Sequence, residues 1–194
     1  MAGSVKSVAV FCGSRMGNSP LYRTVAEQAG QILAKNGVKL VYGGGSNGLM
    51  GVVADSTLKA GGTVTGIIPH FLHSRENMHE GVTDLIVVDS MHERKQIMFD
   101  TADAYWILPG GFGTFDETME ILTWKQLQRH AKPILLVNAD GWGDALIAML
   151  DASVKQGFAE STARAKIEVV PDVEAAFARS ISETRQYAIS VEQF

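Results

Sequence analysis

Residues 104–117 read AYWILPGGFGTFDE, the pattern of a buried strand that passes through a tight turn into a helix. The first four residues are apolar, as in a strand covered on both faces. The residues after the turn, 118–124, keep helical spacing. The first N–H groups of such a helix have no partner within it, and the helix start attracts anions. The pattern therefore predicts a phosphate site at its glycines, with Glu117 placed one turn further on to face the sugar of a nucleotide.

The remainder of the chain repeats this alternation of apolar strands and helices. Strands are expected at 5–12, 38–42, 63–68, 84–88, 104–107, 133–137 and 167–170. Helices are expected at 20–36, 49–60, 91–99, 112–124, 144–155 and 173–183. This order predicts an α/β fold, a Rossmann-like doubly wound parallel sheet of about seven strands with helices on both faces. We expect one domain over residues 1–194, with a core at 5–183 and a loosely held tail from Gln186.

The overall composition excludes several classes of protein. The net charge of −4 gives no basic surface for a nucleic-acid polymer. Cys12 is the only cysteine, so neither an intrachain disulfide nor a cysteine metal site is expected. No secretory leader and no apolar run of membrane-spanning length is seen, and we expect a cytoplasmic protein without a membrane partner.

A second glycine-rich turn, residues 43–48, has the spacing G-x-G-x-x-G after an expected strand. This spacing resembles a dinucleotide fingerprint, but the acidic residue expected near Thr65 is missing. A turn that lines a phosphate or nucleotide is the favoured explanation of the glycines, and a mere tight connection is the alternative. Ligands of this fold bind at the carboxyl ends of the strands. We therefore expect the residues that follow two of these strands, Gly13, Ser14, Gly44 and Gly45, to line the site.

Residues 91–95, MHERK, open the helix before the phosphate turn. Arg94 or Lys95 could bind a phosphate or orient Glu117, although a solvated charged turn is the ordinary explanation. The polar stretch 70–83, which contains Glu76, is expected to be a loop at the same edge of the sheet. Its histidines and His92 lack the spacing of a zinc site, so no metal is predicted.

Two motifs in this order resemble those of one family. Residues 109–117 fit P-G-G-x-G-T-x-x-E and residues 91–95 fit M-H-x-R-K; residues 42–45 and 49–51 add to the match. From about residue 5 to 180 the chain resembles the Lonely Guy (LOG) family of cytokinin-activating phosphoribohydrolases. Members have often been labelled lysine decarboxylases, but no lysine here is placed as a Schiff-base residue.

The resemblance implies hydrolysis of the N-glycosidic bond of a nucleoside 5′-monophosphate, without metal or cofactor. The substrates implied are N6-substituted adenosine monophosphates and AMP. Matched by position, Arg94 and Glu117 are the catalytic pair. The implied substrate-binding residues are Glu76, Arg94, Lys95, Gly110, Gly111, Phe112, Gly113, Thr114, Phe115, Asp116, Glu117 and Thr123. The family also implies a homodimer or a larger homo-oligomer.

Three other functions remain open at this point. One is an AMP nucleosidase of nucleotide salvage, which would share the chemistry but not the preference for N6-substituted bases. Another is a non-catalytic protein that binds a nucleotide or a molybdopterin in the same phosphate turn. A third, an NAD-dependent oxidoreductase, rests on the glycines at 43–48 alone. Because a carrier needs only the phosphate turn, the presence of both Arg94 and Glu117 favours an enzyme.

Overall fold

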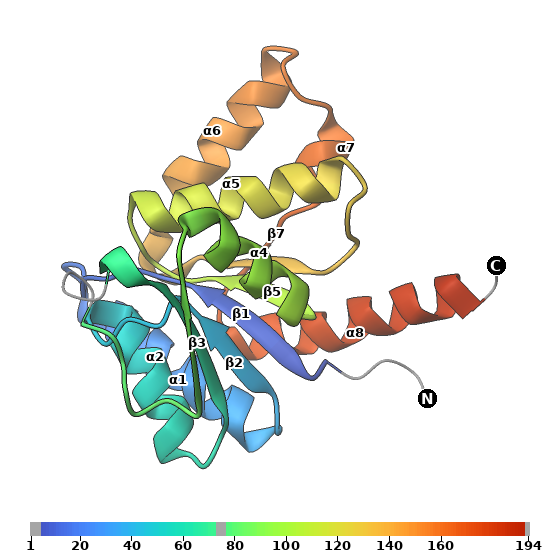
Figure 1. Ribbon diagram of the computed structural model, residues 1–194. Helices are drawn as coiled ribbons and strands as arrows, with labels where there is room; N and C mark the ends of the chain where they lie inside the picture. The colour runs from blue at the N-terminus through green and yellow to red at the C-terminus, as the bar shows by residue number, and fades with distance from the viewer. Residues whose placement is uncertain (1–4, 73–76, 193–194) are drawn as a thin grey trace.

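Seven parallel strands form one sheet in the order β4-β3-β2-β1-β5-β6-β7, which confirms the predicted doubly wound fold. The structure is a computed structural model that describes residues 5–72 and 77–192 (Figure 1). The strands are β1 (Ser7–Phe11), β2 (Lys39–Tyr42), β3 (Val64–Pro69), β4 (Asp84–Val88), β5 (Ala104–Ile107), β6 (Ile134–Val137) and β7 (Glu168–Val170). The chain builds outward from β1 to β4, then returns to the other side of β1 with β5. The carboxyl ends of β1 and β5 therefore form the switch point at which such folds bind ligands.

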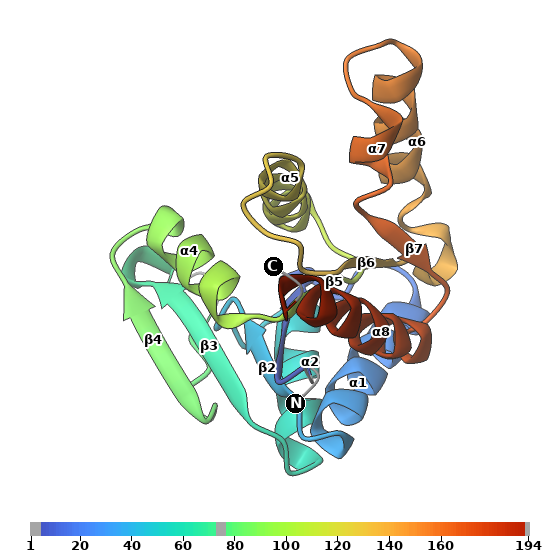
Figure 2. The ribbon, with the colours of Figure 1, turned by 90° about the vertical axis from the view of Figure 1, so that its right-hand side faces the viewer.

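Helices cover both faces of this sheet (Figure 2). One face carries α1 (Pro20–Lys35), α2 (Gly48–Lys59) and α8 (Val173–Glu192), and the other carries α4 (Met91–Thr101), α5 (Phe112–Gln126) and α6 (Asp144–Lys155). The short elements are η1 (His70–Leu72), η2 (Ala139–Gly141) and α7 (Ser161–Arg164). Side chains of β1 alternate between the two cores: Val8 and Val10 pack with the first group of helices, Ala9 and Phe11 with the second. A strand buried on both faces has no polar side, which explains its continuous apolar sequence.

Local sequence signals fix where the helices start and how they pack. The Ser90 hydroxyl accepts a hydrogen bond from the Glu93 N–H at 3.1 Å and caps α4. Ser19 caps α1, which begins at Pro20 as its sequence predicts. Gly30 of α1 lies against α2, where an added Cβ would approach the carbonyl oxygen of Val53 to 2.6 Å. The glycine therefore permits the close contact between these two helices.

The structure differs from the expectation at the C-terminal end. The last helix continues to Glu192, whereas its predicted end was residue 183. That the segment from Gln186 is loosely held stays a prediction. No glycine or proline interrupts residues 183–192, so nothing in the sequence ends the helix there. Its last turns project away from the body of the protein (Figure 1). Within the described part of the chain, no helix is both long and apolar enough to cross a membrane.

Candidate active site

The loops that follow β1 and β5 meet at the switch point of the sheet. The Gly13 N–H donates a hydrogen bond to the carbonyl oxygen of Pro109 at 3.0 Å. The Gly13 carbonyl oxygen accepts from the N–H groups of Leu49 and Met50, at 2.9 and 3.2 Å, where α2 begins. An added Cβ on Gly110 would overlap the Thr114 hydroxyl and come within 2.9 Å of the Gly13 nitrogen. The proline and the first glycine thus bring the β5 turn into direct contact with the β1 loop.

The start of α5 is open toward solvent, as the sequence predicts. Gly111 is the N-cap residue, and no side chain caps the helix. The first helical hydrogen bond runs from the Phe115 N–H to the Gly111 carbonyl at 3.1 Å, so the three preceding N–H groups have no partner within the helix. A Cβ added at Gly111 or Gly113 would meet nothing within 4 Å. Unpaired donors, the helix dipole and open space together form an anion site.

Arg94 is a buried cation held by backbone carbonyl groups. Its side chain comes from α4, and the residue is only 4% exposed. Its Nε–H donates to the carbonyl oxygen of Ile67 at 3.1 Å, and Nη2 donates to that of Gly43 at 2.9 Å. These bonds tie the guanidinium to the ends of β2 and β3. Since an arginine side chain does not deprotonate in proteins, they hold a permanent positive charge at the edge of the sheet.

Glu117, in the second turn of α5, lines the same cavity as Arg94. This cavity has a volume of about 130 Å³, and the open helix start at 111–114 and Cys12 form other parts of its wall. Burial raises the pKa of the Cys12 thiol, and the nearby Glu117 charge raises it further. The thiol therefore stays protonated and is a poor nucleophile. The chemically active groups of the cavity are accordingly a carboxylate, a guanidinium and backbone donors.

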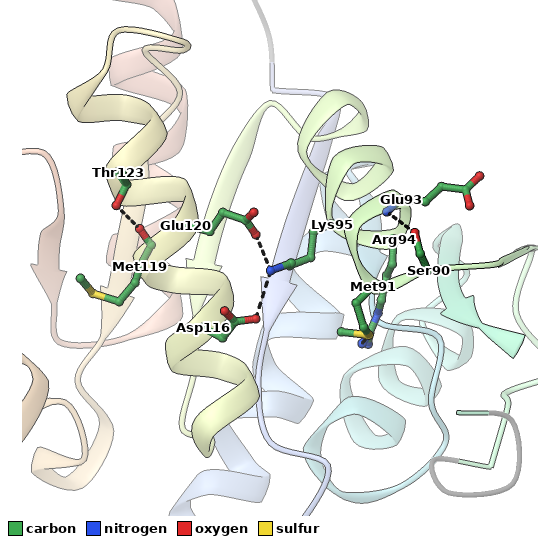
Figure 3. Close-up of polar contacts among 9 residues, drawn as sticks. All are labelled: Ser90, Met91, Glu93, Arg94, Lys95, Asp116, Met119, Glu120 and Thr123. Atoms are coloured by element: carbon green, nitrogen blue, oxygen red, sulfur yellow. Dashed lines mark hydrogen bonds and ion pairs between the residues drawn. The ribbon is translucent and has the colours of Figure 1, made fainter. Parts of the chain in front are cut away.

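Lys95 does not line this cavity, and its side chain bridges α4 to α5 (Figure 3). Its Nζ lies 2.8 Å from Glu120 Oε2 and 3.2 Å from Asp116 Oδ2. Burial acts to lower the pKa of Lys95, but the hydrogen bonds to Glu120 and Asp116 outweigh it and leave the pKa above its ordinary value. Lys95 and Asp116, both predicted to bind the nucleotide, form an ion pair with each other; their contact with substrate stays a prediction.

Gly44, Gly45 and Thr123, which were also predicted to belong to the site, do not line the cavity. Gly44 and Gly45 contact residues 78 and 79: the His79 N–H donates to the Gly44 carbonyl at 3.0 Å, and Gly45 forms a bridge with Met78. Thr123 is exposed, donates to the Met119 carbonyl of its own helix at 2.7 Å (Figure 3), and does not line the cavity. Glu76 lies outside the described residues. In the described ranges, no three potential metal ligands come together.

A second, larger cavity of about 650 Å³ adjoins the first. Its wall includes Gly13, Ser14 and residues 109–112, which were predicted, and Phe115 of the first turn of α5. It also includes Arg15, Tyr22 and Trp142, which the sequence analysis missed. Trp142 lies shortly after β6, at the carboxyl end of the sheet where ligands of this fold bind. That position is the feature of the sequence from which its place in the site could have been predicted.

Known proteins that are similar to this chain belong to the family that the two motifs indicate. The model of a family described as "Possible lysine decarboxylase" matches residues 50–180. A cytokinin riboside 5′-monophosphate phosphoribohydrolase of Arabidopsis thaliana is 44% identical over 167 residues, which cover 86% of this chain and 78% of that protein. An enzyme of the same name from Rhodococcoides fascians is 41% identical over 174 residues, which cover 89% and 88%.

Solved structures with the same fold include proteins that are named for a different function. The molybdenum cofactor carrier protein of Chlamydomonas reinhardtii superposes with a TM-score of 0.70 at 21% identity, covering 94% of this chain and 99% of that one. A molybdenum cofactor binding protein of Rippkaea orientalis gives 0.68 at 22% identity, covering 91% and 95%. At this identity the likeness establishes the fold alone.

Proposed function

The chain belongs to the LOG family of phosphoribohydrolases, and on that premise we propose that it hydrolyses the N-glycosidic bond of adenosine 5′-monophosphates, N6-substituted ones included. The products are the free base and ribose 5-phosphate. One observation carries the proposal: Arg94, Glu117 and the open start of α5 line a single cavity. This combination provides an anion site for the phosphate and, beside it, a carboxylate for the sugar.

In the proposed mechanism the 5′-phosphate accepts hydrogen bonds from the N–H groups at the start of α5. The bond between C1′ and the base nitrogen breaks, and its electron pair leaves with the base, which takes a proton from solvent water. Positive charge develops on the ribose and is stabilised by the Glu117 carboxylate. Water then adds to C1′ and gives up a proton to Glu117, the carboxylate that lines the cavity. Arg94, on the wall of the same cavity, attracts the phosphate.

The test is release of the base by purified protein. AMP and isopentenyladenosine monophosphate are each incubated with the protein, and free base is measured by chromatography. Glu117→Gln should lower turnover by a factor of about 10³ or more while nucleotide binding by calorimetry persists. Glu174→Gln, an exposed carboxylate of α8, serves as the control and should retain full activity. If the folded wild-type protein releases no base from either nucleotide, the proposal is wrong.

The lysine decarboxylase description of the family model conflicts with the state of Lys95. A lysine that forms a Schiff base needs a lowered pKa. Lys95 instead contacts two carboxylates, and its pKa is raised. Its surroundings favour the ammonium form, which is no nucleophile. Lys95 is therefore not a Schiff-base residue, and we favour the glycosidase activity that the names of the relatives carry.

A non-catalytic carrier is the second candidate, and a direct measurement separates it from the enzyme. Such a protein would bind nucleotide and release no base. A preference for AMP would indicate nucleotide salvage, and a preference for N6-substituted nucleotides would indicate cytokinin activation. Side-by-side values of kcat/KM for the two substrates measure this preference.

We also propose a homodimer or a larger homo-oligomer, as the family resemblance implies. The apolar side chains at the exposed end of α5 support this proposal. Leu127, directly after α5, is 66% exposed, and Trp124 and Met119 on the helix are only partly buried. Light scattering coupled to gel filtration measures the mass in solution. Replacing Leu127 by glutamate should weaken the assembly if this surface forms the interface.

A further inference from the structure

The larger cavity lies on the opposite side of α5 from Glu117. At about 100° per residue, Phe115 and Glu117 are about 200° apart around the helix. The buried face of α5, with Thr118 and Leu122, lies between them. Glu117 therefore opens onto the cavity beside β1 and β2, while Phe115 opens onto the cavity at the ends of β5 and β6. The larger cavity, at about 650 Å³, falls within the range of small-molecule sites.

The two cavities meet at the anion site. Both are lined by Gly13, Ser14, Gly111 and Phe112. A phosphate at the start of α5 would thus face both of them. If its nucleoside occupies the cavity of Glu117, the larger cavity lies beyond the phosphate, on the side away from the sugar.

The walls of the larger cavity suit a flat ring. Phe115 and Trp142 stack with their ring centroids 5.5 Å apart and their planes at 11°. The Trp142 Nε1–H donates to the Gly110 carbonyl at 3.1 Å, which fixes the indole to the phosphate turn. Tyr22 of α1 also lines the cavity. Aromatic surfaces of this kind bind planar bases by stacking.

Arg15 is the only charged side chain among the described residues that line this cavity. It follows Gly13 and Ser14, the residues shared with the anion site, by one position. A cation there would meet a second phosphate attached to the first. The carboxylate thus lies in the smaller cavity, the cation and the aromatic residues line the larger one, and the anion site is common to both.

We propose that the larger cavity binds the second half of a dinucleoside 5′,5′-diphosphate, with Arg15 at the second phosphate and the aromatic wall at the second base. The inference rests on the proposed function in one respect, namely that the first phosphate binds at the start of α5. It adds a ligand class, nucleotides extended through a diphosphate, to the monophosphates proposed above.

The test compares two ligands on Glu117→Gln protein, in which turnover does not interfere. Calorimetry gives Kd values for AMP and for P1,P2-di(adenosine-5′) diphosphate. We expect the dinucleotide to bind at least ~10-fold more tightly, which corresponds to about 1.4 kcal/mol. Arg15→Ala should reduce this advantage to less than ~3-fold and leave the Kd for AMP within ~2-fold of its starting value. Trp142→Ala should also reduce the advantage.

Several results would overturn the inference. The first is an equal Kd for the two ligands. The second is a tighter binding of the dinucleotide that persists in Arg15→Ala, and the third is an equal increase of both Kd values in that variant. Arg94→Ala is the matched control on the other side of the anion site. It should increase the Kd values of both ligands by the same factor. Release of adenine from AMP by the wild-type protein is measured in parallel. Release without a dinucleotide advantage refutes only the second site, whereas an advantage without release refutes only the proposed function.

Discussion

Replacing Gly43 by alanine should inactivate the enzyme by displacing Arg94. A Cβ at this position would overlap Nη2 of Arg94 and lie 3.0 Å from its Cζ and 3.3 Å from the Met50 sulfur. The backbone of Gly43 is not left-handed, so alanine can adopt it without strain. The clash falls on the far end of a long side chain, and the guanidinium will therefore shift before the fold does.

The magnitude follows from what the guanidinium loses. Nη2 must leave the Gly43 carbonyl, to which it is bonded at 2.9 Å. A hydrogen bond from a charged donor contributes about 1.5–3 kcal/mol. A displacement of about 1 Å in a catalytic group costs roughly 10²-fold in rate. We therefore expect kcat/KM for AMP to fall by about 10²- to 10³-fold, measured by chromatographic release of adenine.

A double-mutant cycle separates this mechanism from general damage. If Gly43→Ala acts through Arg94, the double variant with Arg94→Ala should be no slower than Arg94→Ala alone. Gly81→Ala, where an added Cβ comes no closer than 3.3 Å to the ring of His79, is the glycine control and should keep full activity. Near-normal activity in Gly43→Ala, or losses that add fully in the double variant, would refute the reasoning.

Three further predictions concern the bridge, the core and the response to acid. The first is a charge reversal of the bridge, made in an Asp116→Asn protein so that Glu120 is the one remaining partner of Lys95 in it. Lys95→Glu should lower kcat about 10-fold, and Glu120→Lys added to it should restore most of the lost kcat. If kcat does not recover, Lys95 contacts the substrate directly. Ser180→Ala should lower the free energy of unfolding by about 1–3 kcal/mol in urea titration, because the buried Trp106 Nε1–H donates to its hydroxyl at 2.9 Å; an unchanged value would contradict this. Burial lowers the pKa of His130 below its ordinary value of 6.5, so the unfolded chain takes up the proton first and stability should fall as pH decreases from about 6.5 to the folded pKa. Urea titrations at several pH values should show this decrease in the wild-type protein and a flatter profile in His130→Gln.

The strands were predictable because burial on both faces leaves a simple signal. β1, β5 and β6 are wholly buried, and each is a short apolar run in the sequence. The helix α7 was not predicted, since its four residues, Ser161–Arg164, are too few to show a period. The extent of α8 was underestimated for a different reason. Polar residues near a terminus resemble a loose tail, although nothing among them breaks a helix.

The central part of the site was predictable because each piece directly follows a strand or opens a helix. Gly13, Gly43 and Gly110 all lie at the carboxyl ends of neighbouring strands, and the topology alone brings such positions together. The partners of Lys95 were not predictable in this way. Whether its ammonium reaches substrate or Glu120 depends on the separation of α4 and α5, which no local pattern encodes.

The bridge gives a physical reason why the two motifs act together. Arg94 and Lys95 are adjacent on α4 and therefore point about 100° apart, one toward the ends of β2 and β3 and the other toward α5. On α5, Glu117 faces the cavity while its neighbour Asp116 and Glu120 receive Lys95. Each motif thus supplies one group to the cavity and at least one to the bridge. A bridge of this kind fixes the spacing of the two helices, and with it the separation of Arg94 and Glu117 across the cavity.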